Sequence, residues 1–253
     1  MTTYENLTIT DQDSVRTIAL NRAAKKNAIN VELARDLTDA LRDAADDDAV
    51  KVLVVTGQKD FFCAGVDLTV FTGMAGGDGD LTLITKLNEP LQQFPKPLIA
   101  AVEGKAVGMG VTILPFFDMV YAGDDATFLT PFAKLGIVLE YGSSFTLPRL
   151  IGRQRANELI LRAKPIDAAT AEAWGLVTRV FPKDRLHEEV LAIATDVAAN
   201  APNATRMSRD LLRAGEESTL DTAIAAEWDM LMNKCYGSEE FLQSVQAFFM
   251  KGK

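Results

Sequence analysis

The stretch from Leu98 to Gly110, LIAAVEGKAVGMG, decides how this chain folds. It opens with five apolar residues, Leu98–Val102, and runs into a turn that ends Gly108-Met109-Gly110. A strand that is apolar on both faces is typical of a buried parallel sheet, and glycines let the backbone that follows approach a ligand closely. Residues after Gly108 can begin a helix whose free N–H groups favour an anion. We therefore expect an α/β fold with a candidate ligand site at a strand end.

Outward from this stretch, short apolar runs alternate with helical patterns. Val15–Leu20, Val52–Val55 and Met119–Ala122 predict further strands. Between the first two, Asn30 is a candidate N-cap, and the apolar residues after it repeat at helical spacing. A second helix is predicted from about residue 81 to 93, where prolines then stop it. The first half of the chain therefore alternates between strand and helix.

The C-terminal part is predominantly helical. After about Gly152 the strand signals fade, except at Leu176–Val180. We divide the chain into a core over residues 1–195 and a C-terminal helical region over residues 196–253, although no linker marks the boundary. The glycine-rich loop Gly73–Asp80 is either a flexible connection or a wall over a pocket. The predicted helices are Ala156–Leu161, His187–Ala199, Asn203–Arg213, Leu220–Met232 and Glu239–Phe249.

Composition excludes several classes of protein. The 253 residues include 26 basic and 35 acidic side chains, giving a formal net charge of −9, which argues against a surface built for nucleic acid or anionic lipid. No apolar run approaches the roughly 18 residues needed to span a membrane, so no membrane span is expected. Cys63 and Cys235 lie far apart, and the first residues do not form a secretion signal. We therefore expect a cytoplasmic protein.

Two further chemistries are disfavoured. His187 is the only histidine and no Cys-x-x-Cys pair occurs, so no metal site is expected. A Ser-His-Asp site would have to use His187, which we interpret instead as a solvated side chain on an exposed helix. The Gly108 turn has Ile113 where a dinucleotide fingerprint needs its third glycine, and no Walker A sequence occurs. Carboxylates and backbone N–H groups remain as the carriers of chemistry.

Several motifs together carry a resemblance to a known family. They are Leu20-Asn21-Arg22 with Asn27-Ala28-Ile29-Asn30, Phe62-Cys63-Ala64-Gly65-Val66-Asp67-Leu68, Ala101-Val102-Glu103-Gly104 with Gly108-Met109-Gly110, and Ala171-Glu172-Ala173-Trp174-Gly175-Leu176-Val177. This pattern resembles the crotonase superfamily of enoyl-CoA hydratases and isomerases over nearly the whole chain. The resemblance implies a crotonase-like spiral of ββα turns and a helical C-terminal trimerisation region that forms a homotrimer or a dimer of trimers. It also implies an acyl-CoA thioester as substrate, with no cofactor beyond its coenzyme A moiety.

The resemblance assigns roles to both glycine turns. In this family two backbone N–H groups hold the thioester oxygen, and at the matching positions they belong to Val66 and Met109. Such an oxyanion hole stabilises the negative charge that develops on this oxygen more than it stabilises the neutral carbonyl.

The resemblance also places the coenzyme A moiety along the first half of the chain. Its phosphates are expected beside the basic cluster of Arg22, Lys25 and Lys26, which is otherwise interpreted as a solvated helix entrance. Lys251 is expected to reach a neighbouring subunit's ligand. The remaining expected contacts are Ala28, Ala64, Gly65, Asp67 and Leu68.

The acidic residues decide which reaction the resemblance implies. Hydratases of the family carry two glutamates, but the matching positions here are Thr112 and Phe132, which we expect to line the acyl pocket with Leu135. The segment from residue 130 to 144 resembles peroxisomal-type Δ3,Δ2-enoyl-CoA isomerases, in which the acid matching Glu140 is the catalytic base. Because an apolar run leads up to Glu140, we expect desolvation to raise its pKa.

The sequence thus predicts a Δ3,Δ2-enoyl-CoA isomerase. A single base can remove a proton at C2 and return it at C4 while the oxyanion hole stabilises the dienolate, and no water has to be activated. Two alternatives stay open. One is a 2-enoyl-CoA hydratase that uses Glu140 in a rearranged site, and the other is an acyl-CoA-binding member of the superfamily without catalytic activity.

Overall fold

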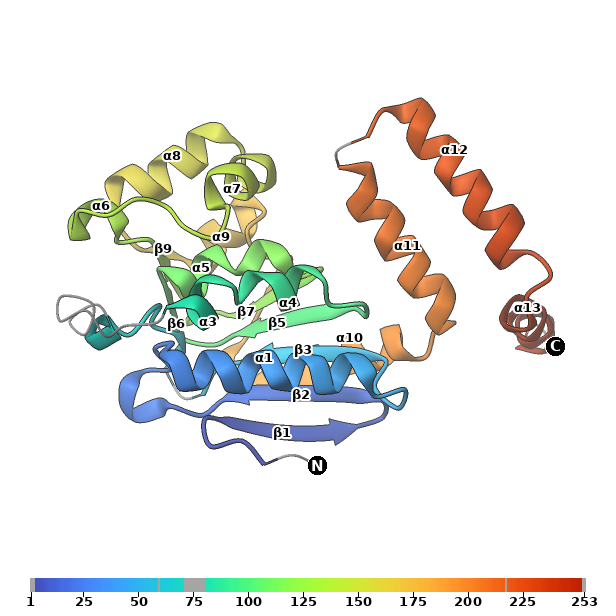
Figure 1. Cartoon of the computed structure of the whole chain (residues 1–253), viewed down its shortest axis with the longest axis horizontal. Coiled ribbons are helices and arrows are strands. Elements are labelled where there is room, and N and C mark those ends of the chain that lie inside the picture. Colours follow the sequence, from blue (N-terminus) through green and yellow to red (C-terminus); the bar gives the residue numbers. More distant parts are fainter. Residues whose placement is uncertain (1–2, 59, 71–80, 217, 252–253) are drawn as a thin grey trace.

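The computed structural model describes residues 3–58, 60–70, 81–216 and 218–251. Its core contains a six-stranded sheet that is parallel except for the first strand (Figure 1). The four strands predicted from apolar runs in the first half are confirmed. In sheet order the strands are β1 (Leu7–Gln12), β2 (Val15–Leu20), β3 (Val52–Thr56), β5 (Leu98–Val102), β7 (Met119–Gly123) and β10 (Arg179–Phe181).

A second, four-stranded sheet consists of short strands. Three of its strands each follow one strand of the large sheet, so that β3, β5 and β7 lead into β4, β6 and β8. Helical residues come next in the chain, which gives the predicted spiral of ββα turns. Gly104 permits the step from β5 to β6, because a Cβ there would lie 2.1 Å from the Asp60 carbonyl oxygen. The strands are β4 (Phe61–Cys63), β6 (Lys105–Val107), β8 (Thr127–Leu129) and β9 (Ile166–Asp167).

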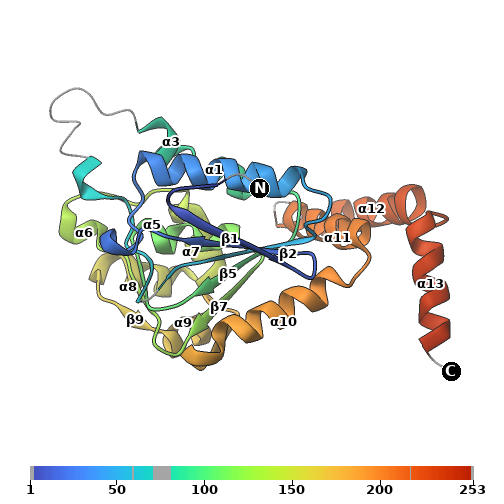
Figure 2. The ribbon, with the colours of Figure 1, turned by 90° about the horizontal axis from the view of Figure 1, so that it is seen from below.

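Helices α1 (Val31–Asp46) and α10 (Leu186–Ala198) cover opposite faces of the large sheet (Figure 2). Alternate residues of β3 face opposite sides, so that Leu53 joins the core cluster under α1 while Val54 packs with residues of α10. This two-sided burial explains why the strand is apolar throughout. The predicted cap of α1 is also confirmed, since Asn30 Oδ1 accepts a hydrogen bond from the Leu33 N–H at 3.0 Å.

Two predicted elements differ from the structure. The helix expected over residues 81–93 consists of two short ones, α3 (Thr82–Thr85) and α4 (Asn88–Gln92). Pro90 explains the break, because it has no N–H to donate to the carbonyl four residues earlier and its ring clashes with that carbonyl. The strand predicted over Leu176–Val180 is displaced to β10. Leu176 and Val177 are buried where the chain leaves the preceding helix, and both N–H groups bond to the Ala171 carbonyl.

The C-terminal helices confirm the predicted periodicity and extend from the core as an arm (Figure 1). Asp118, before β7, anchors this arm: its carboxylate binds Arg209 at 2.6 Å and Arg213 at 3.1 Å, and it also accepts the Leu98 N–H at 2.8 Å. The predicted division between residues 195 and 196 falls inside α10 and stays a prediction. The other α-helices of the described residues are α5 (Met109–Thr112), α6 (Phe132–Leu135), α7 (Ser143–Ile151), α8 (Arg153–Arg162), α9 (Ala168–Trp174), α11 (Pro202–Gly215), α12 (Leu220–Met230) and α13 (Glu239–Lys251).

Across the described ranges, every helix is too short or too polar to cross a bilayer. The glycine-rich loop Gly73–Asp80 lies outside the described residues, so neither of its two interpretations is tested.

Candidate functional site

The two glycine turns meet because β4 and β6 pair in parallel. A Cβ on Gly65 would lie 2.8 Å from the Val107 carbonyl oxygen and 3.5 Å from the Met109 nitrogen. A Cβ on Gly110 would lie 2.6 Å from the Cys63 carbonyl oxygen. The two distances to carbonyl oxygens, 2.8 and 2.6 Å, are too short for a Cβ atom, so glycine is required at Gly65 and Gly110 for the turns to touch.

Val66 and Met109 each present a backbone N–H at this contact. The Gly65 carbonyl and the Asp67 N–H, on either side of the Val66 N–H, both bond to Ile29, at 2.7 and 2.8 Å. No residue that the structure describes accepts a hydrogen bond from the Val66 or the Met109 N–H. Met109 is fully buried. A buried N–H without an acceptor, such as that of Met109, is rare in folded proteins. With the N–H of the half-buried Val66 beside it, this donor suits a ligand oxygen that carries negative charge.

Glu140 lies in the turn that leads from α6 to α7. Its carbonyl accepts the N–H of Ser143 at 3.0 Å, and its neighbour Tyr141 has a left-handed φ of 53°. The Tyr141 hydroxyl donates to the Ile84 carbonyl of α3. These contacts on both sides of the turn fix the backbone from which the Glu140 carboxylate projects.

Burial raises the pKa of Glu140, as the sequence predicts, while a hydrogen bond with Thr112 opposes this rise. The surroundings differ from those expected. Ile137 and Val138, in the apolar run before Glu140, are 50% and 80% exposed, whereas Thr112 and Cys63 are fully buried. Leu139 and Tyr141 are partly buried against the core, so the apolar run is buried only where it reaches Glu140.

Two other ionisable groups are close enough to Glu140 to interact with its charge. Burial raises the pKa of the Cys63 thiol to about 12, and burial also raises the pKa of the Tyr141 hydroxyl. The charge on Glu140 raises both further. Cys63 and Tyr141 therefore keep their protons at neutral pH, which leaves Glu140 to exchange one.

The three residues expected to line the acyl pocket are placed differently. Thr112 and Phe132 are buried, and the Phe132 ring lies 3.9 Å from the position of a Cβ on Gly108. Leu135, at the end of α6, is 50% exposed. The structure therefore brings Thr112 and Phe132 to the second glycine turn and leaves Leu135 at the surface.

Arg22 and Asp67, both predicted to contact coenzyme A, contact each other. Arg22 Nη1 lies 2.7 Å from Asp67 Oδ2 and donates to the Ala28 carbonyl at 3.0 Å. Burial alone would raise the pKa of Asp67, but hydrogen bonds from Arg22 and Thr69 outweigh it and lower this pKa to about 2. The guanidinium therefore holds the first glycine turn in place, and its charge is already matched by a carboxylate.

The two lysines of the predicted basic cluster are exposed. Lys26 Nζ lies 5.3 Å from the centre of the Phe61 ring, and Lys105 Nζ lies 5.4 Å from the same centre. Lys105 was not predicted, because only the pairing of Phe61 with Lys105 between β4 and β6 brings it to Lys26. Two ammonium groups beside Lys25 thus form a basic surface next to the first turn.

The remaining predicted contacts surround this turn. The Ala64 N–H donates to the Lys26 carbonyl at 3.1 Å, and Ala64 is half-buried. Leu68 is 60% exposed. The Lys251 side chain lies outside the described residues.

His187 is not simply solvated, which corrects the sequence interpretation. Its Nε2 lies 3.0 Å from Glu103 Oε2, although half of the imidazole side chain is exposed. Glu103 itself is buried at the end of β5. This pair joins α10 to the strand that carries the second glycine turn, and it gives His187 a structural partner.

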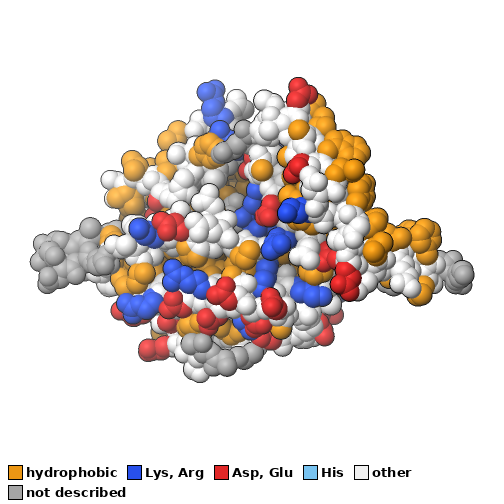
Figure 3. Space-filling model, turned by 45° about the vertical axis from the view of Figure 1, so that its right-hand side comes forward, with side chains coloured by type: hydrophobic (Ala, Val, Ile, Leu, Met, Phe, Trp, Pro, Cys, Tyr) orange, Lys and Arg blue, Asp and Glu red, His pale blue; other side chains and the backbone are white. Residues whose placement is uncertain are grey.

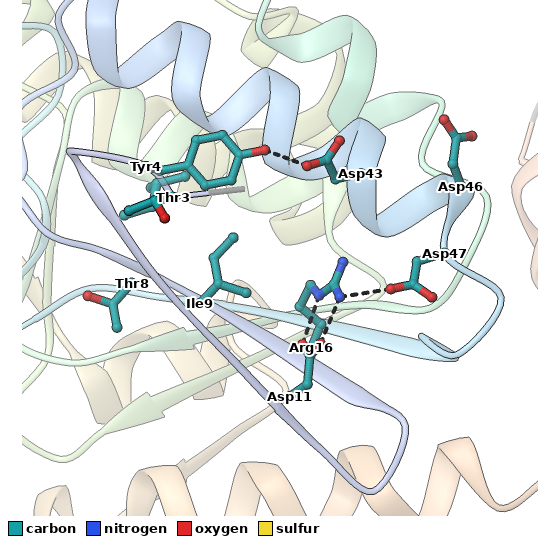
Figure 4. A pocket seen from close by; sticks show the side chains of 10 residues that line it. Thr3, Tyr4, Thr8, Ile9, Asp11, Arg16, Asp43, Asp46 and Asp47 are labelled. Carbon is teal, nitrogen blue, oxygen red and sulfur yellow. Dashed lines mark hydrogen bonds and ion pairs between the residues drawn. The ribbon is translucent and has the colours of Figure 1, made fainter. Parts of the chain in front are cut away.

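A cavity of ≈ 710 Å³ lies between β1 and the end of α1, away from these residues (Figure 4). Arg16 binds Asp11 at 2.7 Å and Asp47 at 2.9 Å in its wall. None of the predicted site residues lines it. We interpret the Arg16 network as a clamp between the β1–β2 hairpin and α1.

A larger groove, of ≈ 1930 Å³, separates the core from the C-terminal arm. Its wall includes Tyr141 and Phe145 on the core side and Arg213 and Phe248 on the arm. Figure 3 shows basic and acidic side chains interspersed on this side of the molecule. Tyr141, the residue after Glu140, lines this groove, but Glu140, Val66 and Met109 are not among its lining residues.

Comparison with known proteins agrees with this geometry. The family model described as enoyl-CoA hydratase/isomerase matches residues 10–253. The chain is 38% identical over 244 residues to human enoyl-CoA delta isomerase 2, covering 94% of this chain but only 62% of that protein's length. It is 36% identical to the 2,3-dehydroadipyl-CoA hydratase of Escherichia coli, over 97% of this chain and 96% of the relative.

Solved structures give the same result. The crystal structure of an enoyl-CoA hydratase from Bacillus anthracis matches with a TM-score of 0.92 at 30% identity, covering 98% of this chain and 97% of that one. Fold, glycine turns and sequence relatives therefore agree, and the chain belongs to the enoyl-CoA hydratase/isomerase family.

Proposed function

We propose that this protein is a Δ3,Δ2-enoyl-CoA isomerase. The observation that carries this proposal is that Glu140 is a half-buried carboxylate whose burial raises its pKa, while the positions that match the two hydratase glutamates are Thr112 and Phe132. A hydratase must activate a water and also deliver a proton, which takes two acid–base groups. Moving a double bond takes a single base that removes one proton and returns it elsewhere.

In the proposed reaction the substrate carbonyl accepts hydrogen bonds from the Val66 and Met109 N–H groups. Glu140 removes a proton from C2, and the electron pair of that C–H bond moves into a dienolate whose negative charge lies mainly on the carbonyl oxygen. The same carboxyl group then protonates C4, which leaves the double bond between C2 and C3. Fixed N–H donors stabilise the dienolate more than the neutral thioester.

The coenzyme A moiety is proposed to lie along the first glycine turn. Lys25, Lys26 and Lys105 offer exposed ammonium groups to its phosphates, while Arg22 holds Asp67 and so keeps the turn in shape. Since the chain is acidic overall, a local basic cluster is what an anionic ligand requires.

The proposal is tested by supplying the purified protein with a 3-enoyl-CoA and, separately, with a 2-trans-enoyl-CoA. We expect conversion of the first substrate to its conjugated isomer to be faster than hydration of the second. Steady-state kcat/KM values for the two reactions measure this preference. Faster hydration would contradict the isomerase proposal and support the hydratase alternative. The 36% identity to a hydratase is the observation that favours this alternative.

We also propose that the chain assembles into a homotrimer or a dimer of trimers through the C-terminal arm. Trp228, Phe248 and Phe249 on this arm are 57%, 77% and 69% exposed, and Figure 3 shows hydrophobic side chains gathered along it. An apolar surface of this kind is typical of a subunit interface. Light scattering after size exclusion is expected to give three or six chains per particle. A monomer at micromolar concentration would contradict this assembly.

Cys63 and Cys235 are both free thiols, which suits a reducing compartment. We therefore propose the cytoplasm as the location of the protein.

A further inference from the structure

Tyr141 stands between the candidate base and the groove beside the C-terminal arm. It follows Glu140 directly in the chain and is half-buried against the core. It also lines the groove of ≈ 1930 Å³, whereas Glu140 does not. Burial and then the charge of Glu140 raise the pKa of the Tyr141 hydroxyl, which agrees with a position beside the carboxylate. One aromatic side chain therefore borders both the site and the groove.

Hydrogen bonds on both sides hold Tyr141 in this position. Its hydroxyl donates to the carbonyl of Ile84, a buried residue of α3 that lies 57 positions earlier in the chain. The Glu140 carbonyl accepts the Ser143 N–H at 3.0 Å and the Ser143 hydroxyl at 2.6 Å. Between these contacts the backbone is left-handed at Tyr141 and Gly142, with φ of 53° and 65°. Such a φ is uncommon for a bulky residue, so the tertiary contact with α3 keeps the ring where it is.

The proposed reaction directs the acyl chain toward this ring. The thioester oxygen is held by the Val66 and Met109 N–H groups, and C2 and C4 both lie at the Glu140 carboxylate. Carbons beyond C4 therefore extend past Glu140, where Tyr141 is the next residue and lines the groove. A volume of ≈ 1930 Å³ exceeds the roughly 300–1,000 Å³ of a typical ligand pocket, so the groove has room for a long chain.

We propose that the Tyr141 ring, tied to α3 by its hydroxyl, is the end wall of the acyl pocket and makes this protein selective for short acyl chains. This inference rests on the proposed function, because it takes the direction of the acyl chain from the roles of Val66, Met109 and Glu140. Without the ring, the pocket would continue into the groove and accept longer chains.

Affinity for saturated acyl-CoAs tests the wall without requiring a reaction. We expect the original protein to bind hexanoyl-CoA at least as tightly as decanoyl-CoA. Tyr141→Ala is expected to tighten the binding of decanoyl-CoA about tenfold to a hundredfold, because each methylene that leaves water improves affinity about fourfold. Alanine also has a Cβ, so the left-handed backbone is no more strained than before. Calorimetric Kd values measure the change, and an unchanged Kd for decanoyl-CoA overturns the inference.

Tyr141→Phe distinguishes the ring from its hydroxyl. Phenylalanine keeps the ring but cannot donate to the Ile84 carbonyl, so we expect the preference for hexanoyl-CoA to stay while urea denaturation shows a loss of stability. If this variant binds decanoyl-CoA as tightly as Tyr141→Ala does, the ring is not the barrier and the inference is wrong. Tyr141→Leu replaces the alanine variant if that one does not fold, because leucine keeps apolar contact with the core but is shorter than tyrosine.

Phe145→Ala is the matched control for Tyr141→Ala. Phe145 lines the same groove, but it is 43% exposed and its ring centre lies 3.3 Å from the guanidinium carbon of Arg149. Its removal widens the groove without opening the proposed wall, so we expect both Kd values to stay as they are. Equal gains for decanoyl-CoA in the two variants would mean that Tyr141 is not the wall.

The binding and activity measurements have separate outcomes. A protein that isomerises a 3-enoyl-CoA but binds decanoyl-CoA more tightly than hexanoyl-CoA overturns the wall and leaves the isomerase proposal in place. A protein that prefers hexanoyl-CoA, loses this preference in Tyr141→Ala and converts neither test substrate supports the wall and contradicts the isomerase. Failure to bind either saturated acyl-CoA contradicts both.

Discussion

Replacing Glu140 by glutamine is expected to lower kcat for 3-enoyl-CoA isomerisation by about a thousandfold. Glutamine retains the shape of glutamate but cannot accept the C2 proton, and a positioned general base typically contributes about 10²–10⁴ in rate. Affinity for an unreactive acyl-CoA is expected to change little, because the proposed carbonyl contacts are backbone N–H groups. Steady-state kinetics and calorimetric binding measure the two quantities separately.

Glu32→Gln is the control for this substitution, since Glu32 lies in the first turn of α1, where its carboxylate accepts a hydrogen bond from the Asn30 side chain. We expect it to leave turnover unchanged. A Glu140→Gln variant that isomerises as fast as the original protein would show that the base is another group. If the original protein binds acyl-CoA but converts neither test substrate, the non-catalytic alternative gains.

The pH dependence of the activity also tests whether Glu140 is the base. Glu140 acts as a base only when ionised, and its pKa is raised above the ordinary glutamate value. Activity is therefore expected to fall as the pH is lowered, and to begin falling at a higher pH than a solvated glutamate would give. Glu140→Gln should remove this acidic limb from any residual activity.

Replacing Gly65 by alanine is expected to lower activity about a hundredfold and to destabilise the fold. Gly65 has a φ of +85°, and a Cβ there would lie 2.8 Å from the Val107 carbonyl oxygen. The two glycine turns must then move apart, which separates the Val66 and Met109 N–H groups. Losing one donor of an oxyanion hole typically costs about 10²–10³ in kcat. Kinetics and urea denaturation measure both effects.

Gly152→Ala separates backbone strain from the close contact. Gly152 has a φ of +82°, nearly that of Gly65, but nothing lies within 4 Å of the position of its Cβ. With a φ of +82° and a ψ of 148°, Gly152 has a backbone conformation nearly confined to glycine, so we expect Gly152→Ala to carry a backbone strain of about 1–3 kcal/mol of its own. Only Gly65→Ala should lose activity. Equal losses of activity in both variants would mean that the contact between the turns is not what matters.

The parts of the fold that the sequence predicted are those that local physics determines. Strands buried on both faces, such as β3 and β5, are apolar throughout, and the cap of α1 depends on Asn30 and the first turn alone. The strands of the small sheet are two or three residues long, too short for any periodicity to appear. Pro90 divided a helix that the apolar pattern alone favoured.

The candidate site depends on contacts between distant parts of the chain, and these could not be read from the residues. Arg22 meets Asp67 across 45 positions, and Lys105 meets Lys26 only because β6 pairs with β4. The resemblance to a family supplied Val66, Met109 and Glu140, each at a single position. It did not supply the proximity of Glu140 to the Cys63 thiol, because that depends on how the turn after α6 packs against β4.

The carboxylate of Asp118 joins the C-terminal arm to the large sheet. It binds Arg209 and Arg213 of α11 and accepts the first N–H of β5, and the other end of β5 leads into the turn that presents Met109. A force on the arm would therefore be transmitted to the strand that leads into the turn of Met109. Asp118 thus connects the proposed subunit interface with the proposed oxyanion hole through a single strand.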